Sequence, residues 1–361
     1  MLHLTETIDA KISAEHAGLR YTNLDTPGIT RRKVGKGFSF RSPDGQRVTS
    51  PEGIQRIRSL AIPPAWTDVW ISPDPRGHIQ AIGKDERGRR QYRYHSKFRE
   101  VRESAKFEHL IAFAESLPSL RARVKSDMAK PGLGHSKVLA TVVHLLETTM
   151  IRVGNAAYAR DNKSYGLTTL LNRHVSIDGA ELRFNFTGKS GKTWCLNFRD
   201  RRVARIVKNC QEIPGQHLFQ YVDDAGEHQP ITSADVNTYL KEVSGSDVTA
   251  KDFRTWTGTL LAAMTLAEFE KADGAAAAKK NVTTAIKHVA ARLGNTPTIC
   301  RKCYVHPDIV AAYLDGELLI EIQKDIDQQL SGNLEHLRPE EGAVLAFLRT
   351  RIARDLRRKA A

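Results

Sequence analysis

The spacing of the hydrophobic residues changes near Lys97, and this change constrains the fold more than any other feature of the sequence. Before it, short alternating runs are interrupted by glycine and proline, which is typical of β-strands. After it, hydrophobic residues recur three and four positions apart, as over 98–117 and 136–150, which indicates amphipathic helices. The sequence therefore predicts an α+β fold with a small β-rich domain, residues 1–96, and a larger, mainly helical domain, residues 97–361.

Local signals add detail to the smaller domain. Residues 37–48 contain two alternating stretches around a Ser-Pro-Asp-Gly turn, and residues 69–82 repeat the pattern around a second turn, so each predicts a strand pair. Between them, residues 51–60 predict a short helix with Ser50 as N-cap and Pro51 at its first position.

The larger domain is interrupted by one clear β signal. Residues 181–187 and 193–198 alternate, and the Gly-Lys-Ser-Gly-Lys stretch between them predicts a hairpin with a basic tip. Helices are expected to resume near Arg201 and to continue, with breaks, to Arg358. We interpret the basic C-terminal stretch of that region as a solvated helix face.

The chain carries 55 lysines and arginines against 41 acidic residues, a formal net charge of +14. Such an excess attracts polyanions, and DNA, RNA, anionic lipid and acidic proteins are all compatible with it. No run approaches the about 20 apolar residues of a membrane span, and the N-terminal segment lacks the apolar core of a secretory signal.

Four cysteines do not suggest a disulfide scaffold, so we expect a reducing, cytoplasmic environment. Cys300 and Cys303 form a CxxC pair, but no second pair follows at zinc-ligand spacing, which favours packing over metal binding.

Tyr304 lies in a segment that predicts a short helix. Thr296 can cap it, Pro297 can occupy its first position, and Pro307 limits its length, which puts Tyr304 about two turns in, after two basic residues. A phenol has a pKa near 10, so it needs cationic neighbours to act as a nucleophile. By itself, this pattern more often belongs to a packed or surface tyrosine.

Five segments in a fixed order resolve that ambiguity. They are Met-Ile-Arg-Val-Gly-Asn at 150–155, the stretch 158–170, the Gly-Lys hairpin tip at 188–189, Lys-Asp-Phe-Arg-Thr-Trp at 251–256 and Arg-Lys-Cys-Tyr at 301–304. Together they resemble the catalytic domain of type IB DNA topoisomerases, specifically the small poxvirus-like enzymes of bacteria. The resemblance covers most of residues 20–307.

The resemblance implies a role for each matching residue. Tyr304 matches the nucleophile, which forms a 3′-phosphotyrosyl bond, and Lys189 matches the hairpin lysine that protonates the leaving 5′ oxygen. Arg152 and Arg254 match the two arginines that hold the non-bridging oxygens. Preorganised cations suit the negative charge that develops on those oxygens, and a positioned lysine suits the developing alkoxide.

Two further positions bear on the family pattern. Asn295 stands nine residues before the tyrosine, where many members carry histidine; asparagine can donate a hydrogen bond to phosphate but cannot become a cation. Lys251, three residues before the second arginine, matches a supporting lysine that contacts DNA. Tyrosine recombinases share this chemistry but usually carry histidine there, so Lys251 favours a topoisomerase.

The basic run 84–99 resembles the family's DNA-contacting strand, which implies that Gln91, Tyr92 and Tyr94 touch bases in the major groove. The alternative is a solvated edge strand whose charges prevent aggregation. If the strand does contact bases, we expect the two lobes of a single monomer to close around the duplex as a clamp.

These observations predict an isomerase that relaxes supercoiled duplex DNA in the nucleoid without ATP, metal or another cofactor. The sequence contains no GxxxxGK[ST] loop that would imply ATP. Two alternatives remain at this point: a site-specific tyrosine recombinase, and a non-catalytic DNA-binding protein, which would form no covalent complex.

Overall fold

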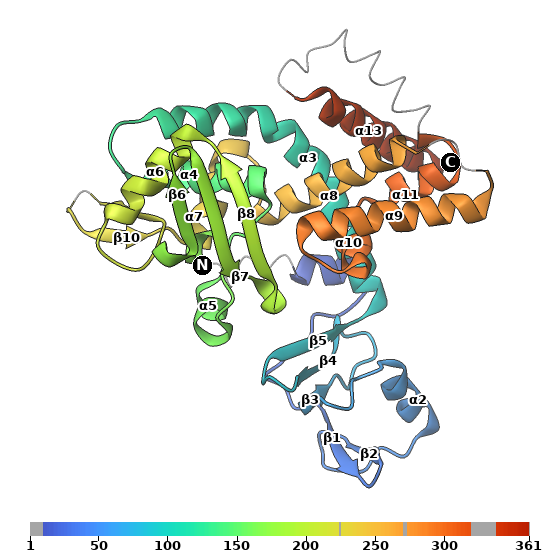
Figure 1. The fold of residues 1–361 in the computed structure, drawn as a ribbon. Helices are drawn as coiled ribbons and strands as arrows, with labels where there is room; N and C mark the ends of the chain where they lie inside the picture. The colour runs from blue at the N-terminus through green and yellow to red at the C-terminus, as the bar shows by residue number, and fades with distance from the viewer. Residues whose placement is uncertain (1–9, 224, 270–272, 319–336, 361) are drawn as a thin grey trace. The chain divides into compact units, whose positions relative to one another are not determined.

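The computed structural model describes residues 10–223, 225–269, 273–318 and 337–360 (Figure 1). The chain divides into two compact units, Met1–Glu108 and His109–Ala361, and helix α3, Ser96–Ala129, includes the boundary. The first unit is built on an antiparallel sheet and the second is mainly helical, which confirms the α+β prediction.

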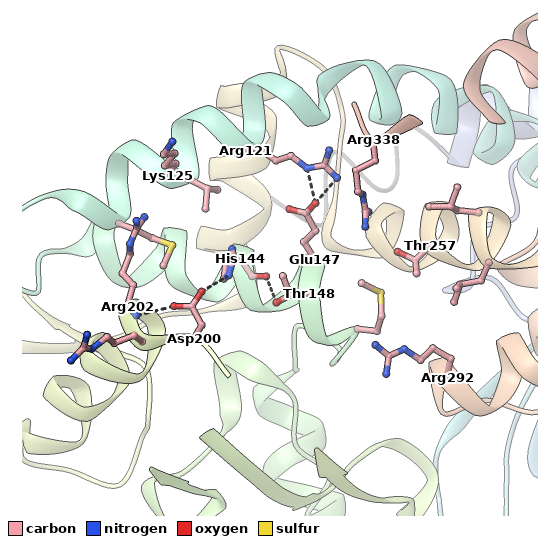
Figure 2. Close-up of a pocket in the computed structure, with 16 residues that line it drawn as sticks. Arg121, Lys125, His144, Glu147, Thr148, Asp200, Arg202, Thr257, Arg292 and Arg338 are labelled. Carbon is pink, nitrogen blue, oxygen red and sulfur yellow. Dashed lines mark hydrogen bonds and ion pairs between the residues drawn. The ribbon is translucent and has the colours of Figure 1, made fainter. Parts of the chain in front are cut away.

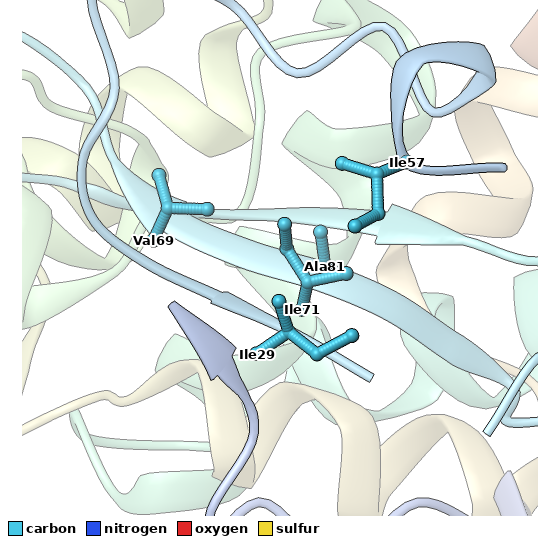
Figure 3. Packing of buried hydrophobic residues seen from close by; sticks show 5 residues of the cluster. All are labelled: Ile29, Ile57, Val69, Ile71 and Ala81. Carbon is cyan, nitrogen blue, oxygen red and sulfur yellow. The ribbon is translucent and has the colours of Figure 1, made fainter. Parts of the chain in front are cut away.

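A five-stranded antiparallel sheet in the order β2-β1-β3-β4-β5 forms the first unit. Its strands are β1 Ile29–Val34, β2 Gly37–Arg41, β3 Thr67–Ile71, β4 Ile79–Lys84 and β5 Arg90–Tyr94. Helix α2, Pro51–Ser59, starts at the predicted Ser50 cap, whose hydroxyl accepts a hydrogen bond from the amide of Gly53. The buried cluster joins this helix to the sheet through Ile29, Ile57, Val69, Ile71 and Ala81 (Figure 3).

The predicted pairing of β3 with β4 is confirmed, and so is the predicted return of residues 46–48 beside β2, whereas β1 was not predicted. β1 pairs along the whole length of β2, and residues 46–48 pair with the other edge of β2, where the amide of Val48 donates to the carbonyl of Phe40 at 3.0 Å. The turn itself forms, because the amide of Gly45 donates to the carbonyl of Ser42. The return stretch is too short to count as a strand of the sheet.

The second unit consists mainly of helices. Their bounds are α4 His135–Thr149, α5 Ala156–Asn162, α6 Arg201–Glu212, α7 Ser233–Ser244, α8 Ala250–Ala267, α9 Ala275–Leu293, α10 Pro297–Cys303, α11 Pro307–Leu314 and α13 Pro339–Ala360. Helix α3 was predicted to end at Leu117 but continues through Pro118, with Leu117 and Leu120 both buried beside the proline. Their burial offsets the helix hydrogen bond that proline cannot make.

The predicted basic-tipped hairpin is confirmed and forms part of a three-stranded sheet. β7, Glu181–Thr187, pairs with β8, Thr193–Arg199, and β6, Val175–Asp178, pairs with the other edge of β7. A small two-stranded sheet, β9 Gln220–Val222 and β10 His228–Pro230, was not predicted. Within the ranges that the structure describes, no helix is both long and apolar enough to cross a membrane.

Candidate active site

Arg152 follows a sharp change of direction at the end of α4. Met150 ends the helix in the left-handed conformation (φ 60°), and the next two residues leave toward the segment around Gly166. The amide of Leu167 donates to the carbonyl of Arg152 at 2.9 Å. A Cβ at Gly166 would lie only 2.5 Å from that carbonyl oxygen, so glycine is required where the two segments cross. The backbone of Arg152 is therefore fixed on both sides.

Arg254 is held inside the protein by helix α8, and only 4% of its surface is exposed. One terminal nitrogen of the guanidinium donates to the carbonyl of Met150, and the other donates to the carbonyl of Leu293 at 2.5 Å. Its Nε is buried and has no hydrogen-bond partner. A buried cationic donor without an acceptor is costly, so this nitrogen is suited to receive an anionic ligand.

The electrostatics around Arg254 also favour binding of an anionic ligand. Burial, together with the charge of Arg152, lowers the pKa of Arg254 to about 10, although Tyr304 acts in the opposite direction. Two guanidiniums are therefore held near each other in a poorly solvated site. An anion between them would relieve both the repulsion and the desolvation.

Tyr304 is delivered by the short helix α10. The predicted cap is confirmed: the hydroxyl of Thr296 accepts from the amide of Ile299, and Pro297 is the first helical residue. Tyr304 itself caps the C-terminal end, with its ring centroid 5.3 Å from the guanidinium carbon of Arg254.

The backbone of Tyr304 is positioned by α8, the helix that also carries Arg254. Thr259 donates from its hydroxyl to the carbonyl of Tyr304 at 3.4 Å and accepts from the amide of His306. Gly258 has no side chain, and any Cβ there would collide with that carbonyl. Sequence reasoning missed both residues, because a Gly-Thr pair inside a helix gives only a weak signal without the facing segment.

Asn295 connects three parts of the site. It follows Gly294, which ends α9 in the left-handed conformation (φ 62°). Its Oδ1 accepts from Nη2 of Arg152 at 2.5 Å, and its backbone carbonyl accepts from Nζ of Lys192 at 3.4 Å. The side chain of Asn295 thus fixes the orientation of the Arg152 guanidinium.

Four of the predicted site residues lie together in the structure: Arg152, Arg254, Asn295 and Tyr304. The two predicted lysines, which the structure also describes, do not contact them. Lys189 is exposed at the hairpin tip, next to Ser190 in the left-handed conformation (φ 66°). Lys251 is exposed in the first turn of α8. Among the contacts of the described residues, none joins either ammonium group to the other four side chains.

The two cysteines of the CxxC motif pack beside the site. Cys300 is fully buried and Cys303 is half-buried, in agreement with the interpretation of packing. Burial raises the pKa of Cys300, while the nearby charges of Arg254, Lys192 and Arg152 act against this rise.

The proposed DNA-contacting residues lie on β5, an edge strand of the first unit. Tyr92 and Tyr94 are both exposed and stack with ring centroids 5.9 Å apart. Gln91 is half-buried, belongs to the opposite face of the strand, and donates from its amide to Oδ2 of Asp85 at 2.9 Å. The three residues therefore do not form one surface in this structure.

A cavity of about 1120 Å³ lies in the second unit and is lined by none of the predicted site residues (Figure 2). Arg121 crosses it to Glu147 at 2.6 Å and also binds Glu341 at 2.8 Å, which Arg338 binds from the other side. These ion pairs join α3, α4 and the start of α13. The described residues contain no cluster of three or more His, Cys, Asp or Glu side chains that could hold a metal ion.

Comparisons with known proteins agree with this geometry. Residues 95–329 match the family described as eukaryotic DNA topoisomerase I, catalytic core, and residues 37–85 match bacterial DNA topoisomerase IB, N-terminal domain. The chain is 35% identical over 306 residues to DNA topoisomerase 1B of Acanthamoeba polyphaga mimivirus. This alignment covers 82% of this chain and 91% of the viral protein.

More distant relatives extend over a similar length. DNA topoisomerase 1B of Vaccinia virus (strain Copenhagen) and DNA topoisomerase I of Monkeypox virus are each 23% identical to the chain over 318 residues. Each alignment covers 85% of this chain and 96% of the viral protein. Both the catalytic core and the N-terminal domain are matched, and the chain belongs to the type IB DNA topoisomerase family.

Proposed function

We propose that this protein relaxes supercoiled duplex DNA by cutting one strand, letting it rotate, and resealing it. The observation that carries the proposal is the buried guanidinium of Arg254. It lies over Tyr304, near a second arginine, with its Nε donor unpaired. A phosphodiester brings the acceptors that this site lacks, and it places its phosphorus within reach of a phenol.

The reaction is a transesterification in which atoms balance without a cofactor. The Oη of Tyr304 forms a bond to phosphorus, the bond to the 5′ oxygen breaks, and the phenolic proton passes to water. Arg152 and Arg254 hold the non-bridging oxygens, and Lys189 gives its proton to the leaving 5′ oxygen. Resealing is the reverse attack by the 5′-OH on the phosphotyrosyl bond.

Asn295 and Lys251 support this chemistry. The Oδ1 of Asn295 is occupied by Arg152, so the asparagine orients that guanidinium, and its Nδ2 retains a hydrogen for a phosphate oxygen. Lys251 projects from the same helix as Arg254 and contributes a phosphate contact.

The protein acts as a monomer that closes around DNA with two domains, residues 1–96 and 97–361. The smaller domain contributes Gln91, Tyr92 and Tyr94 on β5, of which the stacked tyrosines are already exposed. Because its substrate is duplex DNA, we expect it to act on the nucleoid in the cytoplasm.

The test uses supercoiled plasmid in EDTA without nucleotide. We expect relaxation in single-strand steps, and a denaturant added during the reaction should trap protein on DNA 3′ ends. Peptide mapping of the trapped adduct should identify Tyr304. An absolute need for ATP or a divalent ion, or an adduct on a different residue, would contradict the proposal.

A further inference from the structure

Trp194 lies between the hairpin tip and the connection from α9 to α10. It is the second residue of β8, and its indole approaches two glycines closely. A Cβ at Gly188 would lie 2.8 Å from Cδ1 of the indole, and a Cβ at Gly294 would lie 2.8 Å from Cζ2. Gly188 immediately precedes Lys189, and Gly294 immediately precedes Asn295. One ring therefore contacts the neighbours of two proposed site residues.

The indole is itself held in place. It stacks on Phe186, its partner across the two strands, with centroids 6.2 Å apart and planes 5° apart. The hairpin tip is closed by a hydrogen bond from the amide of Gly188 to the carbonyl of Lys192 at 2.7 Å. The Nζ of Lys192 in turn donates to the carbonyl of Asn295. Lys189, by contrast, is exposed, so the surrounding loop determines where its ammonium lies.

From this juxtaposition we propose that Trp194 is a positioning residue for Lys189. The indole fixes the hairpin tip against the α9–α10 connection, and thereby keeps the lysine within reach of the leaving 5′ oxygen. Trp194 takes no part in the bond changes. The inference rests on the proposed function, since it requires Lys189 to be the proton donor.

The test compares ordinary DNA with DNA that carries a 5′-bridging phosphorothiolate at the cleavage site. A thiolate leaves without protonation because thiols have a pKa near 8.5, so the sulfur substrate removes the need for an acid. Trp194→Ala should cleave ordinary DNA about 10²-fold more slowly, a typical cost of a misplaced catalytic group. On the sulfur substrate most of this deficit should disappear. A general loss of structure would slow both substrates equally.

Two further variants sharpen the comparison. Phe198→Ala removes another aromatic ring from the same face of β8, four residues from Trp194, where it approaches His144 instead of the tip. Any deficit of that variant should be the same on both substrates. Trp194→Ala combined with Lys189→Ala should cleave no more slowly than Lys189→Ala alone, because the tryptophan acts only through the lysine.

The outcomes separate this inference from the proposed function. If sulfur rescues Lys189→Ala but not Trp194→Ala, the inference is overturned and the proposed function stands. If sulfur does not rescue Lys189→Ala, the inference and the acid role of Lys189 are overturned while strand cleavage through Tyr304 stands. If the wild type forms no covalent adduct, the proposed function is overturned together with the inference. Should Trp194→Ala fail to bind DNA, the milder Trp194→Leu replaces it, and an unrescued deficit of that variant also overturns the inference.

Discussion

Arg254 and Tyr304 face each other with 5.3 Å between the guanidinium carbon and the ring centroid, although they come from different helices. The contact is fixed from both sides. Met150 and Leu293 bind the guanidinium through their carbonyls, and Thr259 binds the carbonyl of Tyr304. A cation and a phenol are therefore presented together before any DNA arrives.

This arrangement predicts that Arg254→Lys is not a conservative change. One ammonium keeps the charge but cannot reach both carbonyls and a phosphate in the planar geometry of a guanidinium. We expect single-turnover cleavage to slow by about 10²–10³-fold, with little change in DNA affinity. A cleavage rate within about twofold of wild type would show that the charge alone suffices, against the bidentate role.

Removing one hydroxyl tests the nucleophile. Tyr304→Phe keeps the ring that lies under Arg254, so folding and DNA binding should persist while relaxation and covalent adducts disappear. Tyr221→Phe is the matched control: this tyrosine lies on β9 against His135, and its variant should relax DNA like wild type. Plasmid relaxation by Tyr304→Phe at a rate near wild type would assign the nucleophile elsewhere.

The faces of β5 predict an unequal division of DNA binding. Replacing Gln91, Tyr92 and Tyr94 together with alanine should weaken binding or alter site choice, while cleavage of DNA already bound changes less. Most of the loss should come from the tyrosine pair, because the amide of Gln91 is engaged by Asp85. DNA-binding isotherms of the double variant Tyr92→Ala, Tyr94→Ala and of Gln91→Ala measure the contribution of each face to the affinity. Unchanged binding with a defect confined to cleavage would rule out the contact role.

The sequence predicted the structure well where the signal was local. Ser50 and Thr296 each begin a helix as expected, because a hydroxyl before proline satisfies a free helix amide regardless of what packs nearby. The order of the five motifs identified the family, and four of the six residues expected at the catalytic domain's site lie together or in contact.

Other features depend on contacts between distant segments and were not predicted. Nothing near residues 37–41 indicates that β1 occupies the other edge of this strand, because that pairing depends on the register of the whole sheet. Likewise, Gly258 looks unfavourable within a helix until the carbonyl of Tyr304 is placed against it. The role of Asn295 also appears only in three dimensions, through its bond to Arg152.

The ion pairs of Glu341 with Arg121 and Arg338 predict that the stability of the fold is sensitive to acid. Burial alone would raise the pKa of Glu341, but hydrogen bonds from Arg121 and Arg338 outweigh it and hold the value at about 2, below the ordinary 4.5. The folded state therefore binds this proton more weakly than the unfolded chain. The stabilisation is complete above about pH 4.5 and is lost as the pH falls toward 2.

Glu341→Gln should accordingly lower the free energy of unfolding by about 3 kcal/mol at pH 7, and by progressively less as the pH falls. Glu115→Gln is the control, because its partner Arg349 is exposed, and exposed pairs contribute at most about 1 kcal/mol. Urea unfolding of the helical signal at pH 7 and at pH 3 measures both. Equal losses for Glu341→Gln at the two pH values would contradict the assignment.

Two lysines near the hairpin tip compete for the role of proton donor, and the structure makes the test specific. Lys192 contacts the carbonyl of Asn295, whereas Lys189 is exposed and carries the role only by resemblance. Lys189→Ala should cleave ordinary DNA about 10²–10⁴-fold more slowly, as expected for loss of an acid catalyst, and the 5′-bridging phosphorothiolate should remove most of that deficit.

Lys192→Ala should lose only its contact to Asn295 and show the same modest deficit on both substrates. Arg254→Ala should also remain slow with sulfur, because charge develops on its non-bridging oxygen whichever group leaves. Rescue of Lys192→Ala in place of Lys189→Ala would transfer the acid role to the lysine that already reaches the site.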